Sequence, residues 1–309
     1  MDDVPLTIKN AAQRAGLSTH VIRVWEKRYG AINPERTTTR RRLYSREQVE
    51  RLALLARLTR TGRTIGTIAQ LPTPMLRALA DEGDAVPTST IARPASDGSL
   101  VDRCLEAVRE MEAETLEATL TRAEVQLGAQ GMLRRVVAPL AQAIGEQWRD
   151  GRISAAHEHF ASAVLRSFLL RATHAYAPGL GAPVLVIATP PGQLHELGAL
   201  LVAASAANLG WRCIYLGASL PAAEIVGAAL QQRARAVAIS LVYPEDDPAM
   251  AGELERLRTL LPADCALIVG GRATMAYGAA LEKIGARQCG DLDQLGQQLD
   301  ELRSAAAGR

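Results

Sequence analysis

Five short apolar runs in the last part of the chain restrict its fold more than any other feature. The runs are VLVIAT, RCIYLG, AVAISLV, CALIVGG and the weaker ARQCG, and they alternate with stretches in which apolar residues recur at helical spacing. Strands that alternate with helices in this way form a parallel sheet covered by helices on both faces. The pattern predicts a flavodoxin-like α/β domain of five parallel strands over residues 179–309. Ligands of such domains bind at the carboxyl ends of the strands.

The segment before this domain is expected to be entirely helical. Between Leu100 and Tyr176, apolar residues recur every three or four positions in four separate stripes. This spacing predicts a four-helix bundle over residues 100–178. The preceding sequence, DEGDAVPTSTIARPASDG, is rich in Pro, Ser, Gly and Asp and has no apolar period. We therefore expect residues 82–99 to be a linker.

The first 81 residues contain start and stop signals for short helices. IKNAAQRA ends at Gly16, THVIRVWEKRY ends at Gly30, and a capping box of Ser45 and Gln48 opens REQVERLALLARLTRTG. The polar, basic segment PERTTTRRRLYS, which precedes the third helix, predicts a β-hairpin wing. Residues 1–81 are thus expected to form a winged helix-turn-helix head whose second helix enters the DNA major groove.

The charge distribution supports DNA binding by this head. The whole chain has a net charge of +2, but residues 1–80 hold 15 Lys and Arg against 6 Asp and Glu, a net charge of +9. A basic head on an acidic body is typical of a nucleic-acid-binding domain joined to a ligand-binding part. The predicted DNA contacts are on the second helix and the wing: His20, Arg23, Arg40, Arg41, Arg42 and Tyr44. Arginine can bond to phosphate or to guanine through two nitrogens.

Several other functions are excluded by what the sequence lacks. No apolar run reaches the roughly 18 residues that a membrane span needs, and the first residues are acidic and polar. The four cysteines are scattered without C-x-x-C spacing, which argues against a zinc or disulfide scaffold and fits a cytoplasmic protein. Without a P-loop, a G-x-S-x-G, an H-E-x-x-H or a catalytic barrel, we expect no enzymatic activity.

The head resembles the MerR family of transcription regulators. The matching motifs are LTIKNAAQRAGLS, HVIRVWEKRYG and the wing end RRLYS followed by EQVERL, within about residues 5–72. The resemblance implies binding to an operator in double-stranded DNA as a dimer. It also implies that Thr19, His20, Arg23, and Arg42 with Tyr44, contact DNA, and that Trp25 packs in the core.

A histidine stands where ligands of the predicted sheet should bind. His195 begins a helix after the first strand, where an imidazole can ligate a metal, although a lone histidine there is more often a cap or surface residue. The stretch QLHELG, the S-L-V after the third strand and the G-G after the fourth resemble the D-x-H-x-x-G, S-x-L and G-G elements of cobalamin-binding domains. The resemblance implies His195 as the lower cobalt ligand. It also implies cofactor contacts from Gly192, Gln193, Glu196, Gly198, Ser240, Leu241, Val242, Gly270 and Gly271.

One residue departs from that pattern. Members of the cobalamin-binding family carry Asp or Glu two positions before the histidine, where the carboxylate accepts the other ring proton and raises ligand basicity. Gln193 stands there in this chain. Its carboxamide can accept the same hydrogen bond but carries no charge, so cobalt ligation by His195 is expected to be weaker than in the family.

The bundle carries Trp148, and ten residues later Glu158 and His159. Alone, these would be an ordinary core tryptophan and a surface carboxylate. Followed by the predicted cobalamin domain, they resemble the cap of the cobalamin-dependent photoreceptor regulators of the CarH and LitR type. The resemblance implies that they hold the upper face of adenosylcobalamin. The family can carry a histidine after the tryptophan as an upper cobalt ligand. Arg149 stands here and cannot ligate cobalt because it stays protonated.

These features together predict a transcription regulator, most simply a repressor, controlled by adenosylcobalamin, with light as a candidate input. Expected partners are the DNA operator and further copies of the chain in a dimer or tetramer that competes with RNA polymerase at the promoter. Two alternatives share the architecture: a light-independent cobalamin sensor, and a regulator whose cobalamin site has decayed and which responds to another ligand or to protein contacts. A third, a corrinoid methyl carrier, is disfavoured by the basic head.

Overall fold

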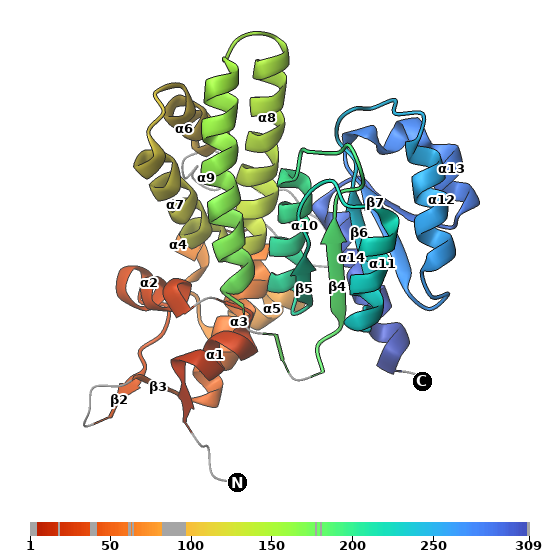
Figure 1. The fold of residues 1–309 in the computed structure, drawn as a ribbon. Coiled ribbons are helices and arrows are strands. Elements are labelled where there is room, and N and C mark those ends of the chain that lie inside the picture. The colour runs from red at the N-terminus through yellow and green to blue at the C-terminus, as the bar shows by residue number, and fades with distance from the viewer. Residues whose placement is uncertain are drawn as a thin grey trace. The chain divides into compact units, whose positions relative to one another are not determined.

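The structure of the chain is a computed structural model. It describes residues 5–17, 19–37, 42–60, 63, 65–81, 97–176, 178–179 and 181–307. The chain divides into two compact units, Met1–Phe168 and Leu169–Arg309. The first holds the head and most of the bundle, coloured red to green in Figure 1, and the second holds the sheet, coloured green to blue. Each unit is described by itself.

The head is a winged helix-turn-helix, as the sequence predicts. Its sheet is antiparallel in the order β1-β3-β2. Gly16 and Gly30 follow the first two helices with φ of 64° and 59°, in the left-handed region that a glycine adopts without strain. The elements are β1 (Leu6–Thr7), α1 (Ile8–Ala15), α2 (Thr19–Tyr29), β2 (Glu35–Arg36), β3 (Arg42–Tyr44) and α3 (Arg46–Arg60).

The predicted capping box is present at the start of α3. The Gln48 backbone N–H donates to Ser45 Oγ, and the Ser45 N–H donates to Gln48 Oε1, both at 3.2 Å. Two short helices follow, α4 (Ile65–Ile68) and α5 (Thr73–Asp81), which the sequence pattern did not predict. They complete the core of the head through Ile65, Ile68 and Leu76.

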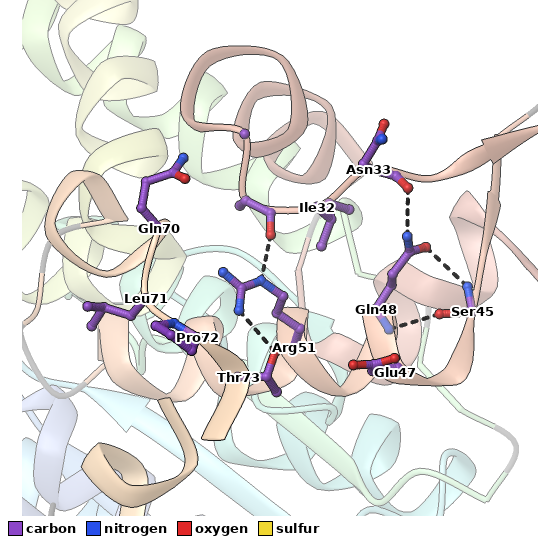
Figure 2. A pocket seen from close by; sticks show the side chains of 12 residues that line it. Ile32, Asn33, Ser45, Glu47, Gln48, Arg51, Gln70, Leu71, Pro72 and Thr73 are labelled. Atoms are coloured by element: carbon purple, nitrogen blue, oxygen red, sulfur yellow. Dashed lines mark hydrogen bonds between the residues drawn. The ribbon is translucent and has the colours of Figure 1, made fainter. Parts of the chain in front are cut away.

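Arg51 of α3 ties these later residues to the rest of the head. Its guanidinium donates to the carbonyls of Ala31 and Ala69, both at 2.7 Å, and to Thr73 Oγ1 at 3.0 Å. Figure 2 shows this side chain in the middle of a pocket of about 530 Å³. Burial lowers the pKa of Arg51 from its ordinary value. Because the guanidinium bonds the head's own backbone, we assign Arg51 to the fold and no ligand to this pocket.

The bundle consists of α6 (Asp97–Arg109), α7 (Ala113–Met132), the π-helical turn η2 (Leu133–Val137), α8 (Ala138–Arg149) and α9 (Ala155–His174). The first of these begins inside the predicted linker 82–99, and residues 82–96 of that prediction lie outside the described residues. α7, η2 and α8 follow without a loop, but Gly128 interrupts α7 with φ 70° and ψ 167°. The four expected helices are therefore present, and the second of them, α7, is broken internally at Gly128.

The second unit contains the predicted five-stranded parallel sheet. Its strand order is β5-β4-β6-β7-β8, which is the flavodoxin-like order. β4 lies between β5 and β6, so the chain reverses direction across the sheet there, and ligands of such folds bind beside that point. The strands are β4 (Val184–Ala188), β5 (Arg212–Tyr215), β6 (Ala236–Ser240), β7 (Ala266–Gly270) and β8 (Arg287–Cys289).

Helices cover both faces of this sheet (Figure 1). Leu185 and Ile187 of β4 face α10 (Leu197–Asn208) and α14 (Leu292–Ala307). Val186 and Ala188 face α11 (Ala222–Gln231) and its neighbours. Strands buried on both faces read as continuous apolar runs, which explains why they were visible in the sequence. The remaining helices on the second face are α12 (Met250–Leu260), the 3₁₀ turn η3 (Arg272–Tyr277) and α13 (Gly278–Lys283).

Within the described residues, the structure has no helix that is both long enough and apolar enough to span a membrane.

Candidate functional site

The recognition helix α2 is divided into a buried and an exposed face. Val21, Ile22 and Trp25 are buried in the core of the head, as predicted for Trp25. Arg23 and Lys27 are exposed, and Thr19 is partly exposed. His20 lies on the same helix, but its side chain is outside the described residues. The helix thus presents basic side chains to solvent, as the predicted DNA contact requires.

The wing is joined to the recognition helix by an ion pair. Arg42 Nε of β3 donates to Glu26 Oε2 of α2 at 2.6 Å, and this hydrogen bond raises the pKa of Arg42. The pair fixes the predicted DNA-binding Arg42 against α2. Tyr44 is completely buried in the head core, so the structure replaces its predicted DNA contact with a packing role. The predicted contacts Arg40 and Arg41 lie outside the described residues.

The candidate cofactor site lies at the carboxyl ends of β4, β6 and β7. The loop after β4 is held by three hydroxyl-mediated bonds. Thr189 Oγ1 donates to the Gln193 carbonyl and accepts the Ser219 N–H at 2.8 Å, while Ser219 Oγ accepts the Gly192 N–H at 3.1 Å. These bonds fix the backbone that carries His195.

Gln193 has a different role from the predicted one. Its side chain is completely buried. Its Oε1 accepts the backbone N–H groups of Val242 at 2.7 Å and Tyr243 at 2.9 Å, and its Nε2 donates to the Pro244 carbonyl at 2.8 Å. The carboxamide therefore clamps the loop after β6 to the loop after β4. Because the carboxamide oxygen already accepts two backbone N–H groups, it is not available to accept the N–H of the His195 ring, which the sequence allowed.

His195 has an aromatic neighbour. The centroids of the His195 and Tyr243 rings are 5.9 Å apart and the rings are nearly perpendicular, at 85°. This is the edge-to-face arrangement that aromatic pairs prefer. Beside it, the Tyr215 hydroxyl donates to Glu196 Oε2, which holds the start of α10 to β5. The imidazole is half-buried at the edge of the sheet, where it is accessible to a ligand.

Small residues allow close packing at this edge. A Cβ on Gly198 would lie 2.7 Å from Ser240 Oγ, and one on Gly271, whose φ is +105°, would lie 2.2 Å from the Leu241 carbonyl oxygen. A Cβ on Gly270 would lie 2.7 Å from the Cys289 carbonyl oxygen. The α10 start and the G-G turn therefore approach the neighbouring strands more closely than any other residue would allow.

Two buried hydroxyls at the same edge have unused hydrogen-bonding capacity. Ser240 Oγ and Thr274 Oγ1 are buried and, among the described residues, make no hydrogen bond. A buried hydroxyl without a partner is unfavourable unless a ligand or water supplies one. Ser240 belongs to the predicted S-x-L element, so its hydroxyl fits a site that a polar ligand completes.

Apolar side chains surround this edge on the surface. Leu194 is 71% exposed, Tyr243 57% and Met275 86%, and they follow β4, β6 and β7 respectively. Large exposed apolar side chains gathered in one place mark a binding surface. With His195 as a metal ligand and Ser240 as a polar partner, the set matches a large, flat, partly apolar cofactor such as a corrinoid.

The bundle residues lie on either side of the turn that joins α8 to α9. Trp148 is 42% exposed, as a residue that packs on a ligand would be. Glu158 accepts Ser162 Oγ at 2.7 Å and pairs with His159 Nδ1 at 2.8 Å, and the His159 side chain is 82% exposed. His157 bonds to Ser154 Oγ at 2.7 Å and to the Arg109 carbonyl at 3.2 Å, which fixes it to the bundle. Arg149 is exposed and donates to the Gly145 carbonyl at 3.2 Å.

The protein side chains alone do not form a metal site in the part of the chain that the structure describes. No group of three or more His, Cys, Asp or Glu is arranged to hold an ion. A metal at His195 would therefore need most of its ligands from a cofactor, as cobalt in a corrin ring has.

Sequence reasoning missed the residues that organise the site. Thr189, Ser219, Tyr243 and Thr274 hold or border the loops at the edge of the sheet, yet none was predicted. Their position directly after predicted strands was the available signal, since ligands of this fold bind there.

Comparison with known proteins gives the same three parts in the same order. The MerR HTH family regulatory protein matches residues 6–72, and two B12 binding domain families match residues 100–171 and 183–290. The HTH-type transcriptional repressor CarH of Myxococcus xanthus is 31% identical over 90% of this chain and 92% of its own length. The repressor CarA of the same organism is 29% identical over 97% of this chain and 98% of its own length. These relatives are transcriptional repressors and not enzymes, which agrees with the sequence prediction.

A solved structure supports the fold. The monomethylamine corrinoid protein of Methanosarcina barkeri is 14% identical and aligns with a TM-score of 0.51 over 67% of this chain and 100% of its own length. At this identity the similarity concerns the architecture alone.

Proposed function

Because the chain belongs to the family of HTH-type transcriptional repressors that includes CarH and CarA, we propose that it represses transcription under the control of adenosylcobalamin. The observation that carries the proposal is the unsatisfied, buried Ser240 hydroxyl beside Gly198, at the sheet edge to which His195 belongs. The same chain presents the exposed Arg23 and Lys27 on a recognition helix. A cofactor site and a DNA-binding face are thus combined in one polypeptide.

Each group of residues has a proposed role toward the cofactor. His195 would ligate the cobalt, with its ring packed against Tyr243. Gly198, Ser240 and Gly271 line the slot for the nucleotide tail, where the Ser240 hydroxyl gains its missing partner. Trp148 and Glu158 of the bundle would contact the adenosyl group of the cofactor. When bound, adenosylcobalamin supplies a cobalt–carbon bond whose cleavage removes the bulky upper ligand.

Control of DNA binding is proposed to act through assembly. Copies of the chain that hold the cofactor associate into a dimer or tetramer, which places several heads on one operator and excludes RNA polymerase. Binding of several linked heads to one DNA raises the overall affinity far above that of one head. The bundle would be a two-state element whose states differ in their affinity for the cofactor, and a shift between these states would weaken the assembly.

The first experiment removes the proposed cobalt ligand. The full chain is mixed with adenosylcobalamin, and bound cofactor is measured from the absorbance spectrum after gel filtration. We expect wild type to retain the cofactor and His195→Ala to lose it or to show a changed lower-ligand spectrum. His174→Ala is the control, because His174 is an exposed residue of α9 that bonds to the Leu170 carbonyl of its own helix. Equal retention by His195→Ala and wild type would contradict the proposal.

The second experiment tests the upper face. An indole packed on a ligand contributes on the order of 3 kcal/mol when its contacts are lost on truncation. Trp148→Ala should therefore bind adenosylcobalamin about a hundredfold more weakly, with a much smaller loss for hydroxocobalamin. Size-exclusion chromatography with adenosylcobalamin, in darkness and under green light, measures the assembly. The role of the cofactor in assembly is excluded if neither cofactor nor light changes the elution of wild type.

Arg149 and His157 favour a light-independent cobalamin sensor as the second candidate. Arg149 cannot replace the adenosyl group on cobalt, and His157 already bonds to Ser154 and the Arg109 carbonyl. A spectrum of the loaded protein that green light leaves unchanged supports this candidate. If light does change it, Arg149→His should give a longer-lived product by supplying the missing imidazole.

A further inference from the structure

The recognition helix makes a buried hydrogen bond to the bundle. Trp25 of α2 is completely buried, and its indole Nε1–H donates to the Val125 carbonyl of α7 at 3.1 Å. The two residues are 100 positions apart. An indole has a single hydrogen-bond donor, so this bond uses all the polar capacity of the side chain. The helix that faces DNA is thus tied directly to a helix that the B12 binding domain family matches.

A break in α7 explains why the Val125 carbonyl can accept this bond. In an uninterrupted α-helix, a carbonyl accepts the N–H four residues later. Gly128 lies between those two positions here, with φ 70° and ψ 167°, which interrupts the regular series of bonds. A carbonyl that loses its helical partner needs another donor when it is buried. The Trp25 indole supplies that donor.

The same glycine allows the head to pack closely on α7. A Cβ on Gly128 would lie 2.9 Å from Thr59 Oγ1, and one on Gly131 would lie 3.6 Å from the Thr59 carbonyl oxygen. Thr59 is a buried residue near the end of α3. Both α2 and α3 of the head therefore pack on α7, at the point where two glycines remove the side chains that would separate them.

This contact leaves the DNA-binding face open. Arg23 and Lys27 are exposed while Trp25, on the other face of α2, is buried against the bundle. The docked head is therefore compatible with DNA binding, and the docking fixes the direction in which the recognition helix points.

We propose that α7 is the docking site of the recognition helix, and that the Trp25–Val125 bond transmits the state of the helical bundle to DNA. The docking concerns residues of the first unit alone and does not depend on cobalamin. Its link to cofactor control rests on the proposed function. The tests below are made without cofactor, so that failure of one proposal can be told from failure of the other.

Hydrogen exchange of the three tryptophan indoles measures the docking in the full chain labelled with ¹⁵N. Trp25 and Trp211 are buried and should exchange slowly, whereas the half-exposed Trp148 should exchange fast. Gly128→Ala places a methyl group against Thr59 and strains a positive φ. It should therefore accelerate exchange of the Trp25 indole N–H at least tenfold and leave exchange of the Trp211 indole N–H unchanged. Adding Thr59→Ala to the Gly128→Ala chain removes the Thr59 hydroxyl, which the new methyl group would approach most closely. It should restore part of the protection of the Trp25 indole N–H from exchange. Unchanged Trp25 exchange in Gly128→Ala overturns the docking.

The DNA affinity of the full chain measures whether the bundle influences the recognition helix. The probe is a duplex selected from a random pool by the wild-type full chain. Trp25→Phe keeps the aromatic ring and removes one buried hydrogen bond, so it should bind this duplex about fivefold more weakly. Trp211→Phe, which removes the indole N–H of a buried tryptophan in the other unit, is the matched control and should bind as wild type does.

Gly128→Ala separates transmission from simple damage to the head. The substitution lies in the bundle, outside the head core, so weaker DNA binding with an unchanged circular dichroism spectrum supports transmission. If Gly128→Ala alters that spectrum, the DNA affinity of Trp25→Phe is used as the test instead. Wild-type affinity in a folded Gly128→Ala protein, or in Trp25→Phe, would show that the bundle does not influence the recognition helix.

Discussion

The recognition helix and the carboxyl edge of the sheet are both candidate binding surfaces, but they are built in opposite ways. α2 presents exposed basic side chains such as Arg23 and Lys27 on a helix whose other face is core. The sheet edge depends on close backbone approach at Gly198 and Gly271 and on the buried Gln193 clamp. The first surface relies on charge and tolerates small displacements. The second relies on shape, and small changes of volume should damage it.

The largest effect is expected at Gly271. A Cβ there would lie 2.2 Å from the Leu241 carbonyl oxygen, in a backbone conformation with φ +105°. Gly271→Ala should therefore lower the free energy of unfolding of the second unit by about 3 kcal/mol or more. Urea unfolding followed by circular dichroism measures it. Gly278→Ala is the control, since its Cβ would meet nothing within 4 Å. Similar stabilities of the two variants would refute the shape-dependent description of the edge.

The next effect is expected from the Gln193 clamp. Gln193→Ala leaves the partly buried N–H groups of Val242 and Tyr243 without their acceptor, which should cost about 2 kcal/mol of unfolding free energy. Amide exchange at these two residues should also become faster. Gln294→Ala removes an exposed glutamine that accepts the Gly290 N–H, and should cost less than about 1 kcal/mol. Equal costs for the buried and the exposed glutamine would mean that the clamp does not hold the edge.

A smaller effect, seen in salt dependence, is expected in the head. Arg23→Ala should reduce the slope of log affinity against log salt by about one unit if this side chain neutralises one phosphate. Arg42→Ala should change the slope less, because Glu26 already neutralises part of its charge. Mobility shifts of a DNA duplex at several salt concentrations give both slopes. Arg287→Ala, in the sheet unit, is the control. A larger slope change in Arg42→Ala would show that the Glu26 pair opens on DNA.

The smallest effect at neutral pH should come from the thiols. Burial raises the pKa of Cys213 from its ordinary value of 9.0 to about 12. Burial is also the largest cause that raises the pKa of Cys289, to about 11. The folded state therefore keeps these protons while the unfolded state loses them above pH 9. Stability should be unaffected below pH 9 and should fall between pH 9 and 12. Thermal unfolding from pH 8 to 11 measures this, and Cys213→Ala should weaken the dependence. An identical pH dependence in Cys213→Ala would contradict this cause.

What could be predicted from the sequence follows the range of the interactions involved. The ends of α1 and α2 at glycines and the Ser45–Gln48 box depend on residues within four positions, and they were predicted correctly. The five parallel strands followed from the alternation of apolar runs with helical stretches. The buried position of Tyr44 was missed because a three-residue strand is too short for its inward face to be recognised.

Contacts between distant residues left no local signal. Gln193 bonds to residues 49 and 50 positions away, and Trp25 bonds to a residue 100 positions away. Trp25 was correctly predicted to be packed, from the resemblance of the head to the MerR family. Its partner depends on where the chain breaks α7, and a glycine inside an apolar stripe does not reveal that break.

The exposed apolar rim of the sheet has a consequence for how long the protein survives. Leu194, Tyr243 and Met275 remain in water when no ligand covers them, and exposed apolar surface favours aggregation and recognition by quality-control proteases. A ligand that binds only the folded chain also lowers the population of the unfolded chain by mass action. Under the proposed function, scarcity of cobalamin therefore reduces the amount of repressor through degradation. The recovery of repression after a shortage is then set by new synthesis of the chain.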